Sequence, residues 1–87
     1  MRYLRVVNWQ KHQHYGQRNP PWIKLYNALL DDFTFMAMPE ASRYRLMAIW
    51  MLASKTGNRI PDDPEWVRQR ISASRPVDMG EFVKAGF

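Results

Sequence analysis

The second half of the chain constrains the fold most, because it alternates helix-forming stretches with short breaks. Residues 46–53 form eight consecutive apolar positions, and the helix that contains them has to end by Gly57. Residues 58–61 (Asn-Arg-Ile-Pro) leave room for one short strand, and residues 63–65 (Asp-Pro-Glu) begin another helix. Residues 76–78 (Pro-Val-Asp) precede a third. The sequence therefore predicts three compact helices with one short strand between the first two.

The ends of these helices carry residues that suit their positions. The starts have proline at the first turn or an oxygen-bearing cap residue before it: Pro39, Asp63 before Pro64, and Asp78 three residues before Glu81. Gly86 follows the last apolar helical residue, where a left-handed cap residue belongs. We therefore expect the last helix to stop there and Phe87 to fold back on Phe82.

A short strand between the first two of three compact helices is the plan of a winged helix-turn-helix. We expect a mostly α (α+β) domain of this kind, with one contiguous core, because 87 residues are too few for two. The residues expected in that core lie on apolar helical stripes: Trp22, Tyr26, Leu29, Tyr44, Met47, Ile49, Trp50, Met51, Val67, Ile71, Phe82 and Val83.

The first third of the chain has a different character. Residues 1–9 mix alternating apolar positions with β-branched and aromatic residues, which predicts an N-terminal strand. Residues 10–19 have no apolar period and predict a polar loop, after which Pro20 and Pro21 begin a helix that runs to Leu30. We divide the single domain into a basic N-terminal strand and loop, residues 1–20, and a winged-helix-like part, residues 21–87.

The positive charge is concentrated in this first third. The chain has a net charge of +5, and residues 1–30 contain five basic residues and no acid. Residues 31–87 carry eight basic and eight acidic side chains, which cancel. This asymmetry indicates a polyanionic partner at the N-terminal end, nucleic acid first and an anionic membrane second. The alternative is ordinary solubility charge on an extended segment.

If DNA is the partner, we expect the contacts to lie in the basic third and around the turn before the last helix. The candidate DNA-binding residues are Arg5, Lys11, His14, Arg18, Lys24, Arg75, Arg68 and Lys84. Tyr15, beside Gly16, is the aromatic residue best placed to stack on a base. The outward face of the last helix combines two acids with two bases, so we expect little base-specific readout.

Other kinds of site are not expected. Each acidic residue has a capping or loop position and no serine or lysine lies in a nucleophile motif, so we expect no enzyme and no catalytic residue. His12 and His14 are the only histidines and cysteine is absent, so we expect neither a metal site nor a cofactor. Eight apolar residues in a row cannot span a bilayer, and we expect an intracellular protein without membrane contact.

Six segments carry a resemblance to a known family: 21–26 (Pro-Trp-Ile-Lys-Leu-Tyr), 29–32 (Leu-Leu-Asp-Asp), 38–42 (Met-Pro-Glu-Ala-Ser), 50–53 (Trp-Met-Leu-Ala), 59–64 (Arg-Ile-Pro-Asp-Asp-Pro) and 85–87 (Ala-Gly-Phe). In these segments the chain resembles the N-terminal domain of phage-encoded replisome-organiser proteins. That domain is related in plan to the winged-helix domain of DnaD-like primosomal helicase loaders.

The resemblance implies a DNA-associating, self-associating domain of a replication-initiation protein in the cytoplasm of a bacterial host. It implies DNA, further copies of the chain, and a replicative helicase or helicase loader as partners. Such proteins continue into wing strands after the Gly-Phe pair, and here nothing follows Phe87. We therefore expect the C-terminal wing to be truncated or absent and the strand at residues 1–9 to pair with another copy.

Two other functions remain open at this point. The domain is either a DNA-associating module or a protein–protein module that oligomerises or docks a replisome partner without DNA. The mixed charge of the last helix favours the second. A phage transcriptional regulator that uses the same fold is a further alternative.

Overall fold

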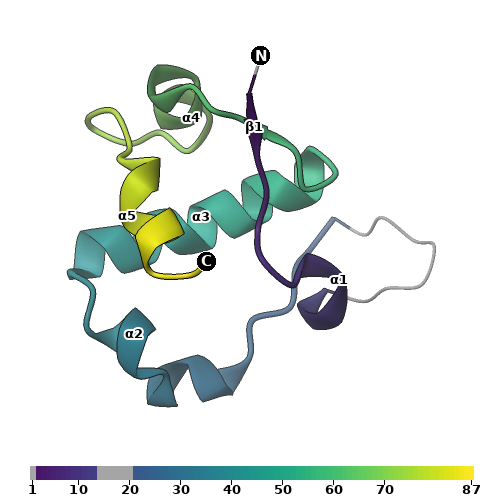
Figure 1. The fold of residues 1–87 in the computed structure, drawn as a ribbon, viewed down its shortest axis with the longest axis vertical. Helices are drawn as coiled ribbons and strands as arrows, with labels where there is room; N and C mark the ends of the chain where they lie inside the picture. Colours follow the sequence, from purple (N-terminus) through teal and green to yellow (C-terminus); the bar gives the residue numbers. More distant parts are fainter. Residues whose placement is uncertain (1, 14–20) are drawn as a thin grey trace.

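The computed structural model describes residues 2–13 and 21–87, with the side chains of residues 11 and 12 outside that description. About half of the chain is helical, and two short strands form an antiparallel sheet, as expected for an α+β domain. The elements in chain order are β1 (Tyr3–Leu4), α1 (Trp9–His12), the 3₁₀ helix η1 (Asn27–Asp31), α2 (Phe33–Met36), α3 (Glu40–Lys55), β2 (Ile60–Pro61), α4 (Pro64–Arg70) and α5 (Met79–Lys84). In Figure 1, α3 crosses the middle of the molecule, with α4 above it, α2 below it, and α5 overlapping its left-hand part in this view.

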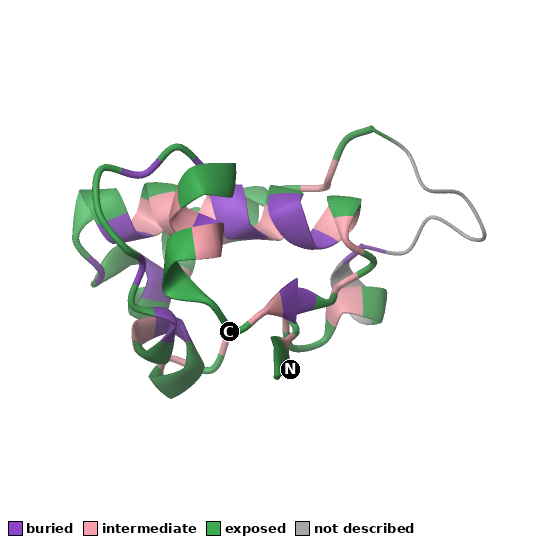
Figure 2. Ribbon diagram, turned by 90° about the horizontal axis from the view of Figure 1, so that it is seen from above, coloured by how far each residue is buried: buried purple, intermediate pink, exposed green. Residues whose placement is uncertain are grey.

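Helix α3 is the central element, as the apolar run predicts. It begins after Pro39, carries Glu40 in its first turn, and ends before Gly57, whose φ of 67° is left-handed. Figure 2 shows buried positions along α3 alternating with half-buried and exposed ones. The prediction that its stripe is fully inward is wrong at two positions, since Tyr44 is 56% and Met51 50% exposed.

The N-terminal strand pairs with its own chain. Leu4 lies opposite Ile60 in the antiparallel β1–β2 pair, and the Asn58 side chain extends this contact by accepting from the Val6 backbone N–H at 2.6 Å and donating to its carbonyl at 3.2 Å. The predicted strand over residues 1–9 is therefore too long, because Asn8 takes a left-handed φ of 58° and turns the chain into α1. Residues 3 and 4 pair with residues 60 and 61 of the same chain, and pairing of the strand with another copy stays a prediction.

The segment after the undescribed residues is not the predicted helix. Residues 21–26 have no regular secondary structure. The Gln13 side chain accepts from the Lys24 backbone N–H at 2.8 Å and donates to the Lys24 carbonyl at 2.7 Å, so both groups bond outside a helix. Asp32 then caps a new helix, α2, by accepting from the Phe35 backbone N–H at 2.8 Å.

Local capping signals place α4 and α5 correctly. The Asp63 side chain accepts from the backbone N–H groups of Glu65 and Trp66, both at 3.1 Å, at the start of α4. The Asp78 side chain accepts from the Gly80 N–H at the start of α5.

After α5 the chain folds back as expected. Gly86 has a φ of 88°, and its N–H donates to the Val83 carbonyl at 3.2 Å. The Phe87 N–H donates to the Phe82 carbonyl at 3.0 Å, which completes a Schellman motif.

One core joins α3, α4, α5, β2 and α2. Its buried apolar residues are Phe35, Met38, Leu46, Ala48, Ile49, Leu52, Ala53, Ile60, Val67, Ile71, Ala73, Val77, Met79 and Phe82. Leu29, Met47 and Trp50 pack against it while half-buried. The predicted inward positions Trp22, Tyr26 and Val83 are wrong, with exposures between 46% and 64%. Their apolar spacing places Trp22 and Tyr26 on a helical stripe, but the segment that carries them is not helical.

Candidate nucleic-acid interface

The described part of the chain contains a cleft of about 420 Å³, which we call the aromatic cleft. Its walls come from the turn into α1, from residues 24–32, from one residue of α3 and from the C-terminal turn. The lining residues are Val6, Val7, Asn8, Trp9, Gln13, Lys24, Leu25, Tyr26, Ala28, Leu29, Asp32, Trp50, Gly86 and Phe87.

Specific hydrogen bonds position the walls of the aromatic cleft. The buried Gln13 amide binds both backbone groups of Lys24, which holds α1 against the extended segment. On another side, the Val7 N–H donates to the Phe87 carbonyl at 2.8 Å. The cleft is therefore built from tertiary contacts between segments that lie far apart in the sequence.

Trp50 forms part of the cleft wall and brings an unusual polar group. Its ring stacks on Phe35 with centroids 6.3 Å apart and meets Phe87 edge-on at 6.1 Å. Its indole Nε1 is buried and has no hydrogen-bond partner among the residues that the structure describes. A buried donor of this kind costs about 1–3 kcal/mol until an acceptor reaches it.

The polar groups of the aromatic cleft are few. Asp32 is its acidic residue, and one of its carboxylate oxygens already caps α2. Lys24 is its basic residue and is half-buried. The rest of the lining is mainly apolar and includes four aromatic rings, those of Trp9, Tyr26, Trp50 and Phe87.

The sequence-predicted DNA-binding residues do not all lie on one surface. Arg5 is exposed beside β1, where it lines a small hollow of about 50 Å³ together with Val83 of α5. Lys84, which follows Val83 in the chain, is also exposed. Arg75 is exposed in the turn before α5, whereas Lys24 lies at the aromatic cleft. His14 and Arg18, the stacking candidate Tyr15, and the Lys11 side chain lie outside the described residues.

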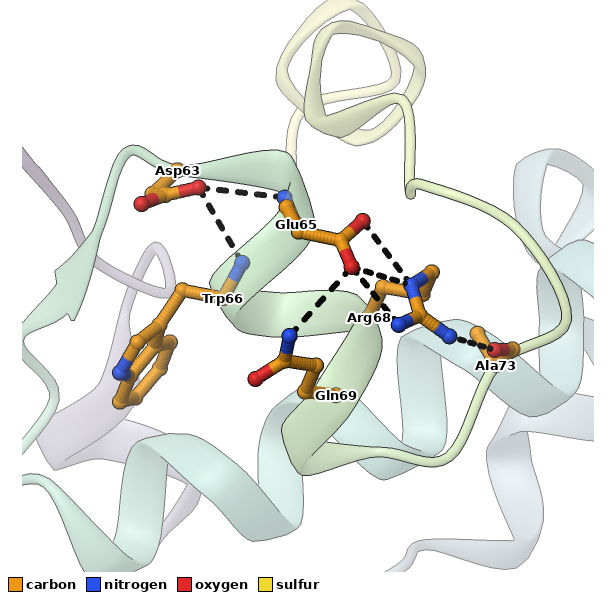
Figure 3. Close-up of polar contacts among 6 residues, drawn as sticks. All are labelled: Asp63, Glu65, Trp66, Arg68, Gln69 and Ala73. Atoms are coloured by element: carbon orange, nitrogen blue, oxygen red, sulfur yellow. Dashed lines mark hydrogen bonds and ion pairs between the residues drawn. The ribbon is translucent and has the colours of Figure 1, made fainter.

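Arg68 has a structural role that the sequence interpretation missed. Figure 3 shows its guanidinium between the Glu65 carboxylate and the Ala73 carbonyl. Nη2 of Arg68 donates to the Glu65 carboxylate at 2.7 Å, and Nη1 donates to the Ala73 carbonyl at 3.2 Å. Hydrogen bonding from Arg68 lowers the pKa of Glu65, and the same bond raises the pKa of Arg68. Arg68 thus holds α4 to the following turn, and its donors are less available for phosphate.

Two other arginines were missed as candidates. Arg59 lies over the Tyr3 ring, with its guanidinium carbon 4.1 Å from the ring centroid, at the β1–β2 sheet. Arg2 has a side chain that is 86% exposed, and its Nε lies 3.7 Å from Asp62. Their positions beside the paired strands were not visible in the sequence, because the pairing of residues 3–4 with residues 60–61 is a tertiary feature.

A second surface feature lies on η1 and α2. Residues 25–36 expose several large apolar side chains, which we call the 25–36 strip: Leu25 52%, Tyr26 46%, Leu30 70%, Phe33 87% and Met36 39%. The sequence interpretation missed the strip, because it predicts a single helix that runs to Leu30 and places Tyr26 on the inward face of that helix. Large exposed apolar patches mark interaction sites in soluble proteins.

Comparison of the chain with protein-family models, curated proteins and solved structures gives no match. Within residues 2–13 and 21–87, no three His, Cys, Asp or Glu side chains are grouped as a metal ion would require. No helix in the described ranges combines the length and apolarity needed to cross a bilayer. We therefore infer function from the charges, contacts and cavities of the chain itself.

Proposed function

We propose that this chain is the DNA-associating, self-associating domain of a phage or prophage replication-initiation protein, of the replisome-organiser or helicase-loader type. The observation that carries the proposal is the concentration of the whole +5 charge in residues 1–30. The described part of that region presents Arg2 and Arg5 at the surface around β1. Such a surface attracts the DNA backbone through counterion release.

The order of the elements supports a winged helix-turn-helix. Helix α3, strand β2, helix α4 and helix α5 follow one another as the three helices and first strand of that fold do. Strand β1 pairs with β2, where a wing strand would otherwise lie. Because α5 presents both Glu81 and Lys84, we expect the domain to bind the DNA backbone with little preference for sequence.

Three exposed basic residues are the best candidates for phosphate contacts in the described part of the chain. Arg5, Arg75 and Lys84 are exposed, and none of them forms an ion pair with another described residue. Arg5 lines a small hollow with residues of α5, Lys84 is the last residue of that helix, and Arg75 lies in the turn before it. These three residues and the basic residues at 11 and 18 make five candidates. We therefore expect the domain to neutralise three to five phosphates when it binds DNA.

The test compares charge variants for binding to a labelled DNA duplex over a series of salt concentrations. The double variant R5Q/R75Q should bind more weakly and reduce the salt slope by about one unit for each lost contact. The control K55Q removes one charge from an exposed lysine in the last turn of α3 that we do not place in the interface. A larger effect of K55Q than of R5Q/R75Q would contradict the proposed surface.

The exposed 25–36 strip favours a protein-docking function as the second candidate. Its partners would be another copy of the chain, a replicative helicase or a helicase loader. Light scattering after size exclusion should show a larger mass for the wild type than for L30E/F33E. T34E places a matched charge at an exposed neighbouring position on α2 and should not change the mass. An oligomer that survives L30E/F33E does not depend on the strip.

A further inference from the structure

We propose that α3 pairs two copies of the chain in an antiparallel arrangement, an inference that rests on the self-association in the proposed function and names its surface. The surface, which we call the outer face of α3, is a row of five residues spaced three or four positions apart: Glu40, Tyr44, Met47, Met51 and Lys55. Residues with this spacing lie one above another on a helix. The row is about 22 Å long, at a rise of about 1.5 Å per residue.

The outer face lies opposite the side of α3 that packs into the core. The buried positions of α3, among them Ile49 and Ala53, fall outside the row. Within the row, Tyr44 is 56% and Met51 50% exposed, and Met47 is half-buried. One aromatic ring and two flexible thioether side chains thus form an apolar row that no other described element covers completely. Such a row suits packing against a second helix.

The two ends of the outer face carry opposite charges. Glu40 lies in the first turn of α3 and Lys55 in its last turn, and both are exposed. Neither forms an ion pair with another residue that the structure describes. An antiparallel second copy brings Lys55 of each chain to Glu40 of the other, whereas a parallel copy would bring like charges together.

A single register suits both the charges and the apolar side chains. In a two-fold pair, each contact between two residues occurs twice, once from each copy. The midpoint between Glu40 and Lys55 is also the midpoint between Tyr44 and Met51, and it lies beside Met47. The axis that sets Glu40 against Lys55 therefore also sets Tyr44 against Met51.

This agreement favours a second copy of the chain as the occupant, because the outer face is complementary to itself. DNA gains little from the same face, since its one acid and one base cancel.

The test reverses the charges at the two ends and measures the dimer dissociation constant by sedimentation equilibrium at low salt. K55E and E40K each bring like charges together at both ends of the pair, so each should raise the constant about tenfold. An equimolar mixture of the two variants should form heterodimers about as tightly as wild type forms homodimers, because both facing pairs are then attractive. K84E is the control, since it reverses an exposed lysine in the last turn of α5, outside the outer face.

A second measurement does not depend on charge reversal. The chain has no cysteine, so Y44C and M51C each carry a single thiol. When the two variants are mixed and oxidised, the disulfide between them should form faster than the disulfide within either variant alone, because the proposed register sets Tyr44 against Met51.

The outcomes separate the α3 pair from the rest of the proposed function. A wild type that stays monomeric at every concentration overturns the pair and the self-association together. A dimer that ignores the charge variants, or that dissociates in L30E/F33E, overturns the α3 pair alone. DNA association is tested separately by the salt series, at protein concentrations below the dimer dissociation constant, so that K55Q still serves there as a control for phosphate contact.

Discussion

Replacing Asp63 by alanine should destabilise the domain far more than the same change at its neighbour Asp62. The Asp63 carboxylate accepts from two backbone N–H groups at the start of α4, those of Glu65 and Trp66, each at 3.1 Å. Loss of an aspartate cap costs about 1 kcal/mol, and loss of its charge at the helix N-terminus adds about 0.3–1 kcal/mol. We therefore expect D63A to lower the free energy of unfolding by about 1–2 kcal/mol.

Asp62 is a matched control because it carries the same charge one residue earlier. Its ion contact is to Arg2 at 3.7 Å, and that arginine side chain is 86% exposed, so the pair contributes at most about 0.5 kcal/mol. Its backbone N–H bond to the Arg2 carbonyl survives in D62A. D63N keeps the acceptor and should recover most of the loss in D63A.

The assay is urea unfolding followed by circular dichroism, with thermal melting as a second measure. In a domain of this size, D63A should lower the melting temperature by about 5–15 °C, and D62A by a few degrees at most. Equal losses in the two variants would refute the cap geometry at α4. Such a result would also weaken the proposed helix-turn-helix, because α4 is the second of its three helices.

Two further predictions concern the core and the pH dependence of stability. W50A should lower the free energy of unfolding, measured in urea, by about 3–5 kcal/mol, because Trp50 packs against Phe35 and Phe87. A loss below about 1 kcal/mol would contradict this packing. Since Arg68 lowers the pKa of Glu65 from 4.5 in the folded state, the stability from this pair is present above pH 4.5 and is lost as the pH falls through the lowered pKa. The stability difference between wild type and E65Q should therefore shrink between pH 6 and pH 3, and a difference that grows on acidification would contradict the pair.

The helices with strong local signals could be predicted from the sequence. Asp63 before Pro64 places the start of α4, and Gly86 places the end of α5, because each signal acts through backbone groups a few residues away. Residues 21–32 could not be predicted in the same way. Their apolar spacing fits a helix, but Gln13 binds the backbone of Lys24 and Asp32 starts a separate helix. A hydrogen bond between distant segments leaves no periodic trace in the sequence.

In the candidate site, too, local features could be predicted from the sequence and contacts between distant segments could not. The basic character of the first third is a property of composition and could be predicted without a structure. The aromatic cleft could not, because Trp9, Tyr26, Trp50 and Phe87 come from four separate segments. Arg68 matched the pattern of an outward basic residue, yet its bonds to Glu65 and to a turn carbonyl became visible only in three dimensions.

The most direct test of DNA association through the basic third is the salt dependence of duplex binding for wild type and K11A/R18A. With three to five phosphates neutralised, the logarithm of the affinity should fall with the logarithm of the salt concentration at a slope of roughly −3 to −5. The double variant should flatten this slope by about two units, because it removes two of the five basic residues in residues 1–30. Affinity that is undetectable at low salt, or that changes with neither salt nor these substitutions, would contradict DNA association through the basic third.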